Sequence, residues 1–428
     1  MARNASPFVA VSLKVGSLSR SNQVHGESSF STGRPTISIE KVFPILALSV
    51  FTALIGMGII IPLIPIYVEL MGVTGIWIGV LFAVYSGTRV VMAPFVGRLS
   101  DRKGRKPLLI AGLILVVVAS LGYIWANTIW QLVMVRIVHG AAGGMIFPIA
   151  MSYVGDLSPI GKEGKWMGYF SATVFMALGV GPLLGGVLTE NFGMTVTFVT
   201  MSCLGFLSFL LTVVLLPESR AKQAVDKARI SFRAIASSGM VQGLFVYRMT
   251  LEAGWGAYIG FISILASVNL GLSASQIGIL LTANILPSSV MMIIFGRIAD
   301  KVSKKGMIVV SGLVTAASLA AMPLVGGFWS LLILNIFAGI VGAAEYPPSS
   351  ALVITEGRRF GMGSTVAVMT MSTGLGMAIG PLMGGFILDA VDVNASFYSA
   401  GGIMVLGIIL LVGLSRRHRY SNDTEDSN

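Results

Sequence analysis

The sequence predicts an all-α membrane protein in which about 12 transmembrane helices form two pseudo-symmetric six-helix bundles. Of the 428 residues, 55% are hydrophobic and 11% are charged, which is far from the composition of a water-soluble chain. Apolar runs of about 20 residues recur along the chain, and each is long enough to cross a bilayer as a helix. Motifs of the first half return in the second half at one constant offset, which predicts that a six-helix unit is duplicated.

The internal repeat has an offset of 199 positions, as from Gly97 to Gly296. The basic turn GRLSDRKGRK at 97–106 has a second copy, GRIADKVSKK, at 296–305. The same offset relates further pairs: Gly140 with Gly339, Gly143 with Gly342, Pro148 with Pro347, Gly181-Pro182 with Gly380-Pro381, Gly185-Gly186 with Gly384-Gly385, and Glu190 with Asp389. Duplicated units of this kind are common in membrane transporters.

The expected spans begin at residue 42. They cover residues 42–70, 76–96, 107–126, 130–155, 167–189, 195–216, 240–268, 276–295, 307–326, 329–353, 365–388 and 395–414. The loops on one side are very short, such as 127–129, so consecutive helices must be antiparallel neighbours.

The expected domains follow from these spans. They are an N-terminal tail (1–41), an N-terminal bundle (42–216), a cytoplasmic linker (217–239), a C-terminal bundle (240–414) and a C-terminal tail (415–428). The N-terminal tail is Ser-rich and basic, and we expect a disordered cytoplasmic segment, with an organelle transit peptide as the alternative. The linker is rich in Lys and Arg, and we expect it to include a short amphipathic helix on anionic lipid.

The distribution of charge predicts the orientation of the chain. The net charge of +11 could suggest nucleic-acid binding, but only three of the 29 Lys and Arg lie inside apolar runs, and the others lie in the tails and alternate loops. This positive-inside pattern predicts a multi-pass protein of the plasma (inner) membrane with both termini in the cytoplasm, in contact with lipid and not with nucleic acid. We also expect a monomer without a cofactor, and not an enzyme, because no nucleophile–base set or metal-ligand cluster is evident.

The basic turn carries a family resemblance. Gly97, Asp101, Arg102, Gly104 and Arg105 resemble the helix 2–3 motif of the major facilitator superfamily, G-x-x-x-D-R-x-G-R-[RK], and the resemblance extends over about residues 42–414. We expect Gly97 to allow close helix approach. The second copy keeps Asp300 but has Ser303 where Gly104 stands. The family implies that Asp101 meets the N-terminus of helix 11 near 363–367, and that Arg105 pairs with Asp156, which together close the cytoplasmic side. Anchoring of topology is the simpler alternative, and we favour it for Lys103 and Lys106.

Two further motifs resemble those of drug exporters in the same superfamily. Helix 5 is similar to the antiporter motif G-x8-G-x3-G-P-x2-G-G, with Ala177 in place of one glycine. Its matching residues are Gly168, Gly181, Pro182, Gly185 and Gly186. Generic helix packing is the alternative, because Gly380 and Pro381 repeat the pattern. The pattern G-x-G-x3-P-x2-P at 56–65 is similar to helix 1 of the twelve-helix drug:proton antiporters, although helix 1 holds no acidic residue at membrane depth.

Ionisable side chains at membrane depth are functional candidates, because the bilayer makes them costly. They are Arg89, Arg136, His139, Arg248, Glu252 and Glu345. The resemblance implies that helices 1, 4, 7 and 10 line a central cavity, and all but Arg89 lie on these helices. Arg136 and His139 share one helical face in a stretch similar to the family motif R-x-x-Q-G. We expect Arg136 to be an anion or proton-coupling site and His139 to be a hydrogen-bonded packing residue.

The acidic residues are the candidates for proton coupling. Arg248 and Glu252 are spaced i and i+4, so they can neutralise each other, and a structural role for Glu252 is the alternative to proton coupling. Glu345 has no partner nearby in sequence and precedes Pro347 and Pro348, which should interrupt the helix. An apolar environment favours its protonated form, so we expect Glu345 to carry the proton. We assign no role to Arg89 from the sequence.

The function expected from these features is secondary active transport. The leading hypothesis is a proton-coupled exporter (antiporter) of small amphipathic compounds or drugs that works by alternating access. The alternative is an uptake symporter for a small organic anion such as a carboxylate. A membrane sensor without transport activity is a third hypothesis, which the intact basic turn disfavours. The sequence does not identify the substrate.

Overall fold

The computed structural model describes residues 39–159, 163–218, 238–360 and 362–425. Residues 37–428 form one compact unit, and the described part is helical throughout, without strands. Residues 1–38 of the expected N-terminal tail and most of the expected linker lie outside the described residues, and tail residues 39–41 belong to the first helix.

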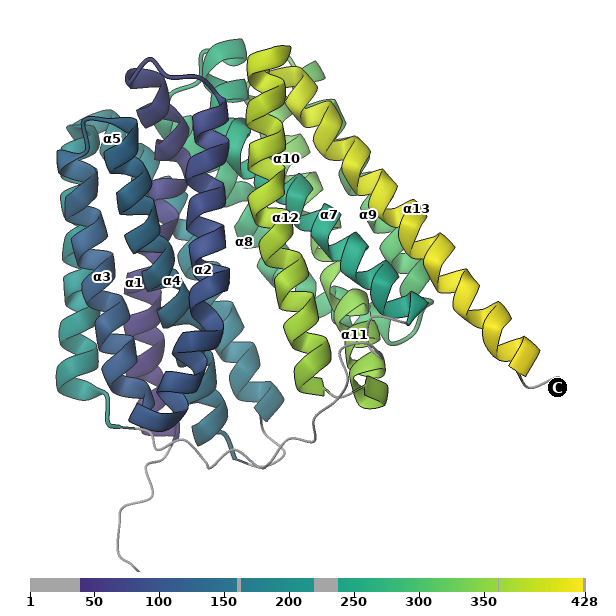
Figure 1. The fold of residues 1–428 in the computed structure, drawn as a ribbon. Helices are drawn as coiled ribbons and strands as arrows, with labels where there is room; N and C mark the ends of the chain where they lie inside the picture. Colours follow the sequence, from purple (N-terminus) through teal and green to yellow (C-terminus); the bar gives the residue numbers. More distant parts are fainter. Residues whose placement is uncertain (1–38, 160–162, 219–237, 361, 426–428) are drawn as a thin grey trace, which may run out of the picture. The chain divides into compact units, whose positions relative to one another are not determined.

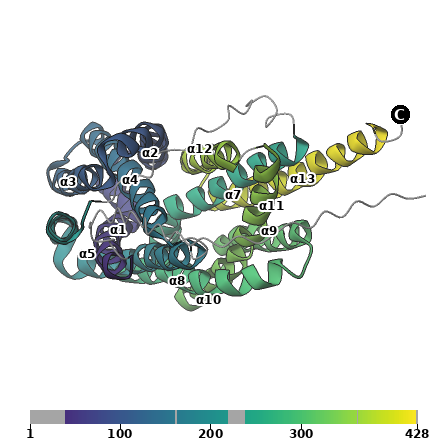
Figure 2. The same cartoon turned by 90° about the horizontal axis from the view of Figure 1, so that it is seen from below.

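Most helices follow the expected spans closely, whereas the last one continues to Glu425, through most of the expected C-terminal tail. In the first half they are α1 (Ile39–Leu70), α2 (Ile76–Lys103), α3 (Arg105–Trp125), α4 (Ile129–Leu157) and α5 (Glu163–Leu215). In the second half they are α7 (Gly239–Ile264), the π-helix η1 (Leu265–Asn269), α8 (Ala274–Ala299), α9 (Lys304–Ala321), the short 3₁₀ helix η2 (Met322–Leu324), α10 (Phe328–Ala343), α11 (Tyr346–Phe360), α12 (Met362–Ala390) and α13 (Val393–Glu425). Figure 2 shows α1–α5 grouped on one side and most of α7–α13 on the other.

Eleven helical segments of the described chain are long and apolar enough to cross a membrane, which confirms the all-α membrane fold. One of them, Lys165–Leu215, has 51 residues and would measure about 76 Å as a straight helix, more than twice the hydrocarbon thickness. The chain turns at Gly193, whose φ of 83° favours glycine. Gly181 before the turn and Met201 after it both contact α1, so this segment is a hairpin of two crossings. The eleven segments thus give twelve crossings.

The predicted tenth span is broken in the middle. Helix α10 ends at Ala343 and α11 begins at Tyr346, so Glu345 lies in a non-helical junction. Pro347 and Pro348 explain the break, because neither has an N–H to donate to the preceding turn. The predicted helices 11 and 12 therefore correspond to α12 and α13.

The duplication extends to the packing of the helices. Gly140 of α4 lies against the backbone of Tyr85 in α2, and a Cβ atom at Gly140 would lie 2.6 Å from the Tyr85 carbonyl oxygen. Gly339 of α10 lies in the same way against the backbone of Asn284 in α8. Both pairs are related by the offset of 199, so the two halves retain the same close helix crossing.

The two ends of the bundle differ in composition. We call the end with the turns at 97–106 and 296–305 the basic end, and the end with the turns at 71–75, 193 and 391–392 the far end. Figure 1 shows the far end at the top, where the ribbons of α2 and α12 converge, and the basic end at the bottom, where they diverge.

Candidate functional site

Glu345 occupies the centre of a buried polar cluster in the second half. Its side chain is fully buried in the junction between α10 and α11. The hydroxyl of Tyr247, on α7, donates to Glu345 Oε2 over 2.5 Å. Among the described residues, Oε1 has no hydrogen-bond partner. A buried carboxyl with one unpaired oxygen is unusual, and it offers a site for a proton or a ligand donor.

Glu252 and Arg248 lie one turn apart on α7 but do not form the expected ion pair. The described part of the chain contains two ion pairs, Arg105–Asp156 and Arg359–Glu356, and the α7 residues are not among them. Tyr346 explains the difference: its hydroxyl donates to Glu252 Oε1 over 3.1 Å, and the Arg248 guanidinium lies 5.7 Å from the centre of its ring. Arg248 Nη1 also donates to Ser349 Oγ over 3.0 Å. Arg248 and Glu252 are therefore near one another without a direct ion pair in this state, and Tyr346 contacts both side chains.

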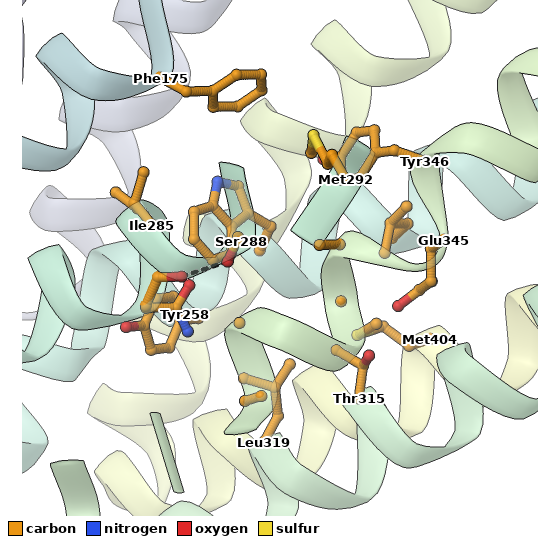
Figure 3. A pocket seen from close by; sticks show the side chains of 17 residues that line it. Phe175, Tyr258, Ile285, Ser288, Met292, Thr315, Leu319, Glu345, Tyr346 and Met404 are labelled. Carbon is orange, nitrogen blue, oxygen red and sulfur yellow. Dashed lines mark hydrogen bonds between the residues drawn. The ribbon is translucent and has the colours of Figure 1, made fainter. Parts of the chain in front are cut away.

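A cavity of about 120 Å³ adjoins Glu345 (Figure 3). Aromatic and methionine side chains form much of its wall, and polar atoms come from a few residues of α8, α9 and the α10–α11 junction. The residues used below are Phe175, Trp255, Tyr258, Asn284, Ser288, Met292, Thr315, Glu345, Tyr346 and Met404. Phe175 belongs to α5, so the first half contributes to the wall. The rings of Trp255 and Tyr258 are stacked with centroids 5.1 Å apart.

An amide network lies beside this cavity. Tyr258 donates through its hydroxyl to Asn335 Oδ1 over 2.6 Å, and Asn284 Nδ2 donates to the Asn335 carbonyl oxygen over 3.0 Å. Sequence reasoning missed these residues, as well as Tyr247 and Tyr346. The two tyrosines had a usable signal, because each directly adjoins a charged candidate in the sequence. Uncharged polar residues such as Asn284 and Asn335 stood out less.

Arg136 and His139 form a separate cluster in the first half. Arg136 is 2% exposed, and its guanidinium lies 5.0 Å from the ring centre of Phe82 and 5.1 Å from that of Tyr85. Its Nε has no partner among the described residues, and no carboxylate there pairs with it. His139 Nδ1 lies 3.1 Å from the Tyr123 hydroxyl, which fits the expected packing role. The structure thus brings together Arg248, Glu252 and Glu345 but not Arg136 and His139, and of these five charged candidates only Glu345 lines the cavity.

The basic turn has a well-defined geometry around Arg105. Its Nε lies 3.0 Å from Asp156 Oδ2, the pair that the resemblance implies, and its Nη1 donates to Ser100 Oγ. Gly104 has a φ of 94°, a backbone conformation that favours glycine between α2 and α3. In the second copy Ser303 has a φ of −61° and accepts a hydrogen bond from Gly306 N, so a different turn begins α9.

Other members of the turn are less defined. The side chains of Asp101 and of most residues at 363–367 lie outside the described part, so the expected Asp101 contact stays a prediction. Asp300 ends α8 as its C-cap, and Arg102 lies in the last turn of α2. Gly97 was expected to allow close helix approach, but a Cβ atom there would meet no described atom within 4 Å. That expectation is wrong in this state, because the helices diverge at the basic end.

The glycine motif of α5 makes close contacts on two sides. Gly181 and Gly185 lie against Gly58 and Ile59 of α1, and Gly186 lies against the start of α8. In α12, Gly380 lies against Ala253 of α7, and Gly385 lies against the start of α2. Pro182 and Pro381 also contact neighbouring helices, whereas a Cβ atom at Gly168 would have no atom of the described residues within 4 Å. The motif therefore packs helices within each half and also joins the two halves.

The sequence matches the family described as Major Facilitator Superfamily over residues 46–251 and 244–427. Multidrug resistance protein 2 of Bacillus subtilis is 27% identical over 387 residues, which cover 86% of this chain and 94% of that protein. Quinolone resistance protein NorA of Staphylococcus aureus is 24% identical over 391 residues, which cover 91% of this chain and 100% of that protein. The crystal structure of a bacterial homologue of the human lysosomal transporter Spinster is similar in fold, with a TM-score of 0.72 at 14% identity over 90% of this chain and 96% of that one.

Proposed function

This chain belongs to the major facilitator superfamily, and from that premise we propose that it is a proton-coupled exporter (antiporter) of small amphipathic compounds. Membership makes it a multi-pass membrane transporter and not an enzyme. The proposal concerns what it moves, in which direction, and what drives the movement. In this proposal the basic end faces the cytoplasm of a cell with the protein in its plasma (inner) membrane, because the basic loops lie at that end.

One observation carries the proton coupling. Glu345 is a fully buried carboxyl with an unpaired Oε1, and it lines a cavity beside the junction of α10 and α11. If the two halves rock, water reaches this cavity from alternate sides and the carboxyl can take up a proton on one side and release it on the other. Substrate and proton would then compete for the same buried region, which is a basis for exchange.

The wall of the cavity supports amphipathic substrates. Its aromatic and methionine side chains offer adaptable apolar contacts, and Asn284, Ser288 and Thr315 add a few polar groups. The volume of about 120 Å³ is smaller than the roughly 300 Å³ or more of pockets for drug-sized ligands. Binding of such a compound therefore requires the cavity to widen as the halves move. The names of the relatives, a multidrug and a quinolone resistance protein, support export.

The basic turn supports a cytoplasmic gate. Arg105 and Asp156 fix the geometry between α2, α3 and α4, and Asp101 would act against the N-terminus of α12 when the cytoplasmic side closes. The bundles at 42–216 and 240–414 would be the two moving units. The protein would work as a monomer, with its substrate and protons as the exchanged partners.

A second candidate is uptake of a small organic anion with protons. The buried Arg136, which has no carboxylate partner among the described residues, favours it as an anion site. Proteoliposomes with imposed pH gradients of both signs and a panel of neutral, cationic and anionic compounds distinguish the two. Proton antiport predicts that substrate accumulates in the more acidic compartment, because it moves opposite to the protons. Symport predicts that substrate accumulates in the more alkaline compartment. No response to either gradient would reject proton coupling.

The orientation has its own test. With Cys203 replaced, single cysteines in the linker at 220–230 should not react with an impermeant thiol reagent added outside intact cells. Labelling from outside would reject the proposed topology.

A further inference from the structure

Two exposed carboxylates join the halves at the far end. Asp389, near the end of α12, accepts from Gly75 N at Oδ1 over 2.6 Å and from Ile76 N at Oδ2 over 2.9 Å. Glu190, beside the turn of the α5 hairpin, accepts from Ser275 N at Oε2 over 2.8 Å. Each carboxylate therefore reaches from one half to the first residues of a helix in the other half, α2 or α8. Figure 1 shows these ends at the top of the bundle.

The two contacts are copies of one another. Glu190 and Asp389 are related by the offset of 199, and so are Ile76 and Ser275. The duplication has thus preserved a contact between the halves, and not only the packing within each half. Because the donors are backbone N–H groups, the pattern required only that each half keep a carboxylate at this position and the close approach of the helix start in the other half.

A glycine supports each contact one helical turn earlier. Gly186 lies against Ala274 and Ser275, and Gly385 lies against Gly75 and Ile76. A Cβ atom at Gly385 would lie 2.6 Å from the carbonyl oxygen of Gly75, so a side chain there would push the helices apart. The glycines bring each helix start close enough for the carboxylate to reach it, and the free N–H groups and the dipole of the first turn favour a negative charge.

Neither carboxylate forms an ion pair with a Lys or Arg of the described residues. Both side chains are exposed, so each contact is weak enough to break and re-form during a transport cycle. We propose that Glu190 and Asp389 form a double latch that holds the far end closed, and that opening to that side requires release of both contacts. The latch rests on the proposed alternating access, and it assigns to Glu190 and Asp389 a role that the sequence motifs do not indicate.

The alternative is that these carboxylates only cap helices. Asp392 provides a matched control, because its Oδ1 accepts from Ala395 N over 2.7 Å and so caps α13 within one half. Loss of a cap lowers stability in all three places, but only a latch should change the distance between the halves.

The distance can be measured on the full-length protein in nanodiscs. Spin labels at Asn127→Cys and Gly326→Cys, in a Cys203→Ser background, place one probe on each half at exposed far-end positions. Pulsed electron–electron double resonance then gives the ratio of far-end-open to far-end-closed molecules. We expect Glu190→Gln and Asp389→Asn each to raise this ratio about threefold, and the double variant to raise it about tenfold. Asp392→Asn should leave the distance distribution unchanged.

The latch would be overturned if the single and double variants, like Asp392→Asn, lowered thermal stability without changing the distance distribution. The single variants decide the question if the double variant does not fold. The readout also separates the latch from the proposed function: a distance shift in a protein that exports none of the compounds tested would keep the latch and reject the exporter.

Discussion

The two halves of this protein share their packing but differ in their buried polar residues. Gly140 and Gly339 make the same close contact at equivalent positions. Beside them the chemistry diverges, because Arg136 corresponds to Asn335 and Tyr85 corresponds to Asn284 at the offset of 199. One half therefore holds a buried cation between aromatic rings, and the other holds a neutral amide network.

The candidate carboxylates at membrane depth, Glu252 and Glu345, also lie in one half. The positions equivalent to Glu252 and Glu345 are Ala53 and Ile146 in the first half. A duplicated bundle can exchange such residues because its helix crossings depend on glycine contacts and apolar packing, which both halves keep. The comparison teaches that the fold depends on what the repeats share, whereas a directional, coupled function would depend on what they do not share.

The largest expected effect concerns Glu345. Replacement by Gln removes the titratable group but keeps the size of the side chain and an oxygen to accept from Tyr247. For exchange with one proton, a gradient of about 2 pH units can sustain up to about 100-fold accumulation, and we expect Glu345→Gln to lose that accumulation entirely. Downhill exchange of substrate should survive, as measured in proteoliposomes without a pH gradient.

Glu69→Gln is the control for this prediction, because Glu69 is an exposed carboxyl at the end of α1. It should transport normally. Accumulation against a gradient by Glu345→Gln would remove the proposed difference between the halves.

A second prediction makes the halves more alike. Arg136→Asn gives the first half the residue of the second half at the equivalent position. We expect kcat/KM to fall about tenfold for compounds that carry an anionic group, which is the size of one charge-assisted hydrogen bond, and to change little for neutral compounds. Arg136→Lys keeps the charge and should retain part of the selectivity, although it loses the planar stacking on Phe82 and Tyr85. An equal loss for all compounds would indicate a packing role.

The shared features of the halves were also the ones that sequence alone could predict. The offset of 199 and the apolar runs predicted the two bundles, and the glycine-proline motifs of α5 and α12 predicted close helix contacts, although not at Gly168 or at Gly97 of the basic turn. The break beside Glu345 followed from Pro347 and Pro348. These predictions succeed because backbone geometry and membrane thickness act on local sequence.

The contacts that distinguish the halves could not be predicted in the same way. The spacing of Arg248 and Glu252 makes them neighbours on α7, but Tyr346 from another segment contacts both charges instead. Asn284 and Asn335 meet only through the crossing of α8 and α10. Such partners depend on tertiary structure, because nothing in the spacing along one helix specifies a third residue.

A smaller effect is expected for Glu252. Gln keeps an oxygen that can accept from the Tyr346 hydroxyl, and Arg248 keeps its contacts with Ser349 and Tyr346. Glu252→Gln should therefore lower the free energy of unfolding by only about 1 kcal/mol, the difference between a charged and a neutral acceptor. Tyr346→Phe removes the hydrogen bond itself, because Phe has no hydroxyl to donate, and should lower stability at least as much in thermal unfolding. If Glu252→Gln folds normally but cannot concentrate substrate, while Glu345→Gln still can, then Glu252 is the proton carrier.

The smallest expected effect tests whether the histidine of the first half is only a packing residue. His139→Gln introduces the residue of the family motif, and an amide can still form a hydrogen bond with the Tyr123 hydroxyl. The change in stability should therefore stay within about 0.5 kcal/mol, and the pH profile of transport should not move. His139→Ala, which copies Ala338 of the second half, leaves the buried Tyr123 hydroxyl without this partner and should cost about 1–3 kcal/mol of stability. A shifted pH profile in His139→Gln at unchanged stability would instead mean that both halves take part in proton coupling, and the chemical division between them would not hold.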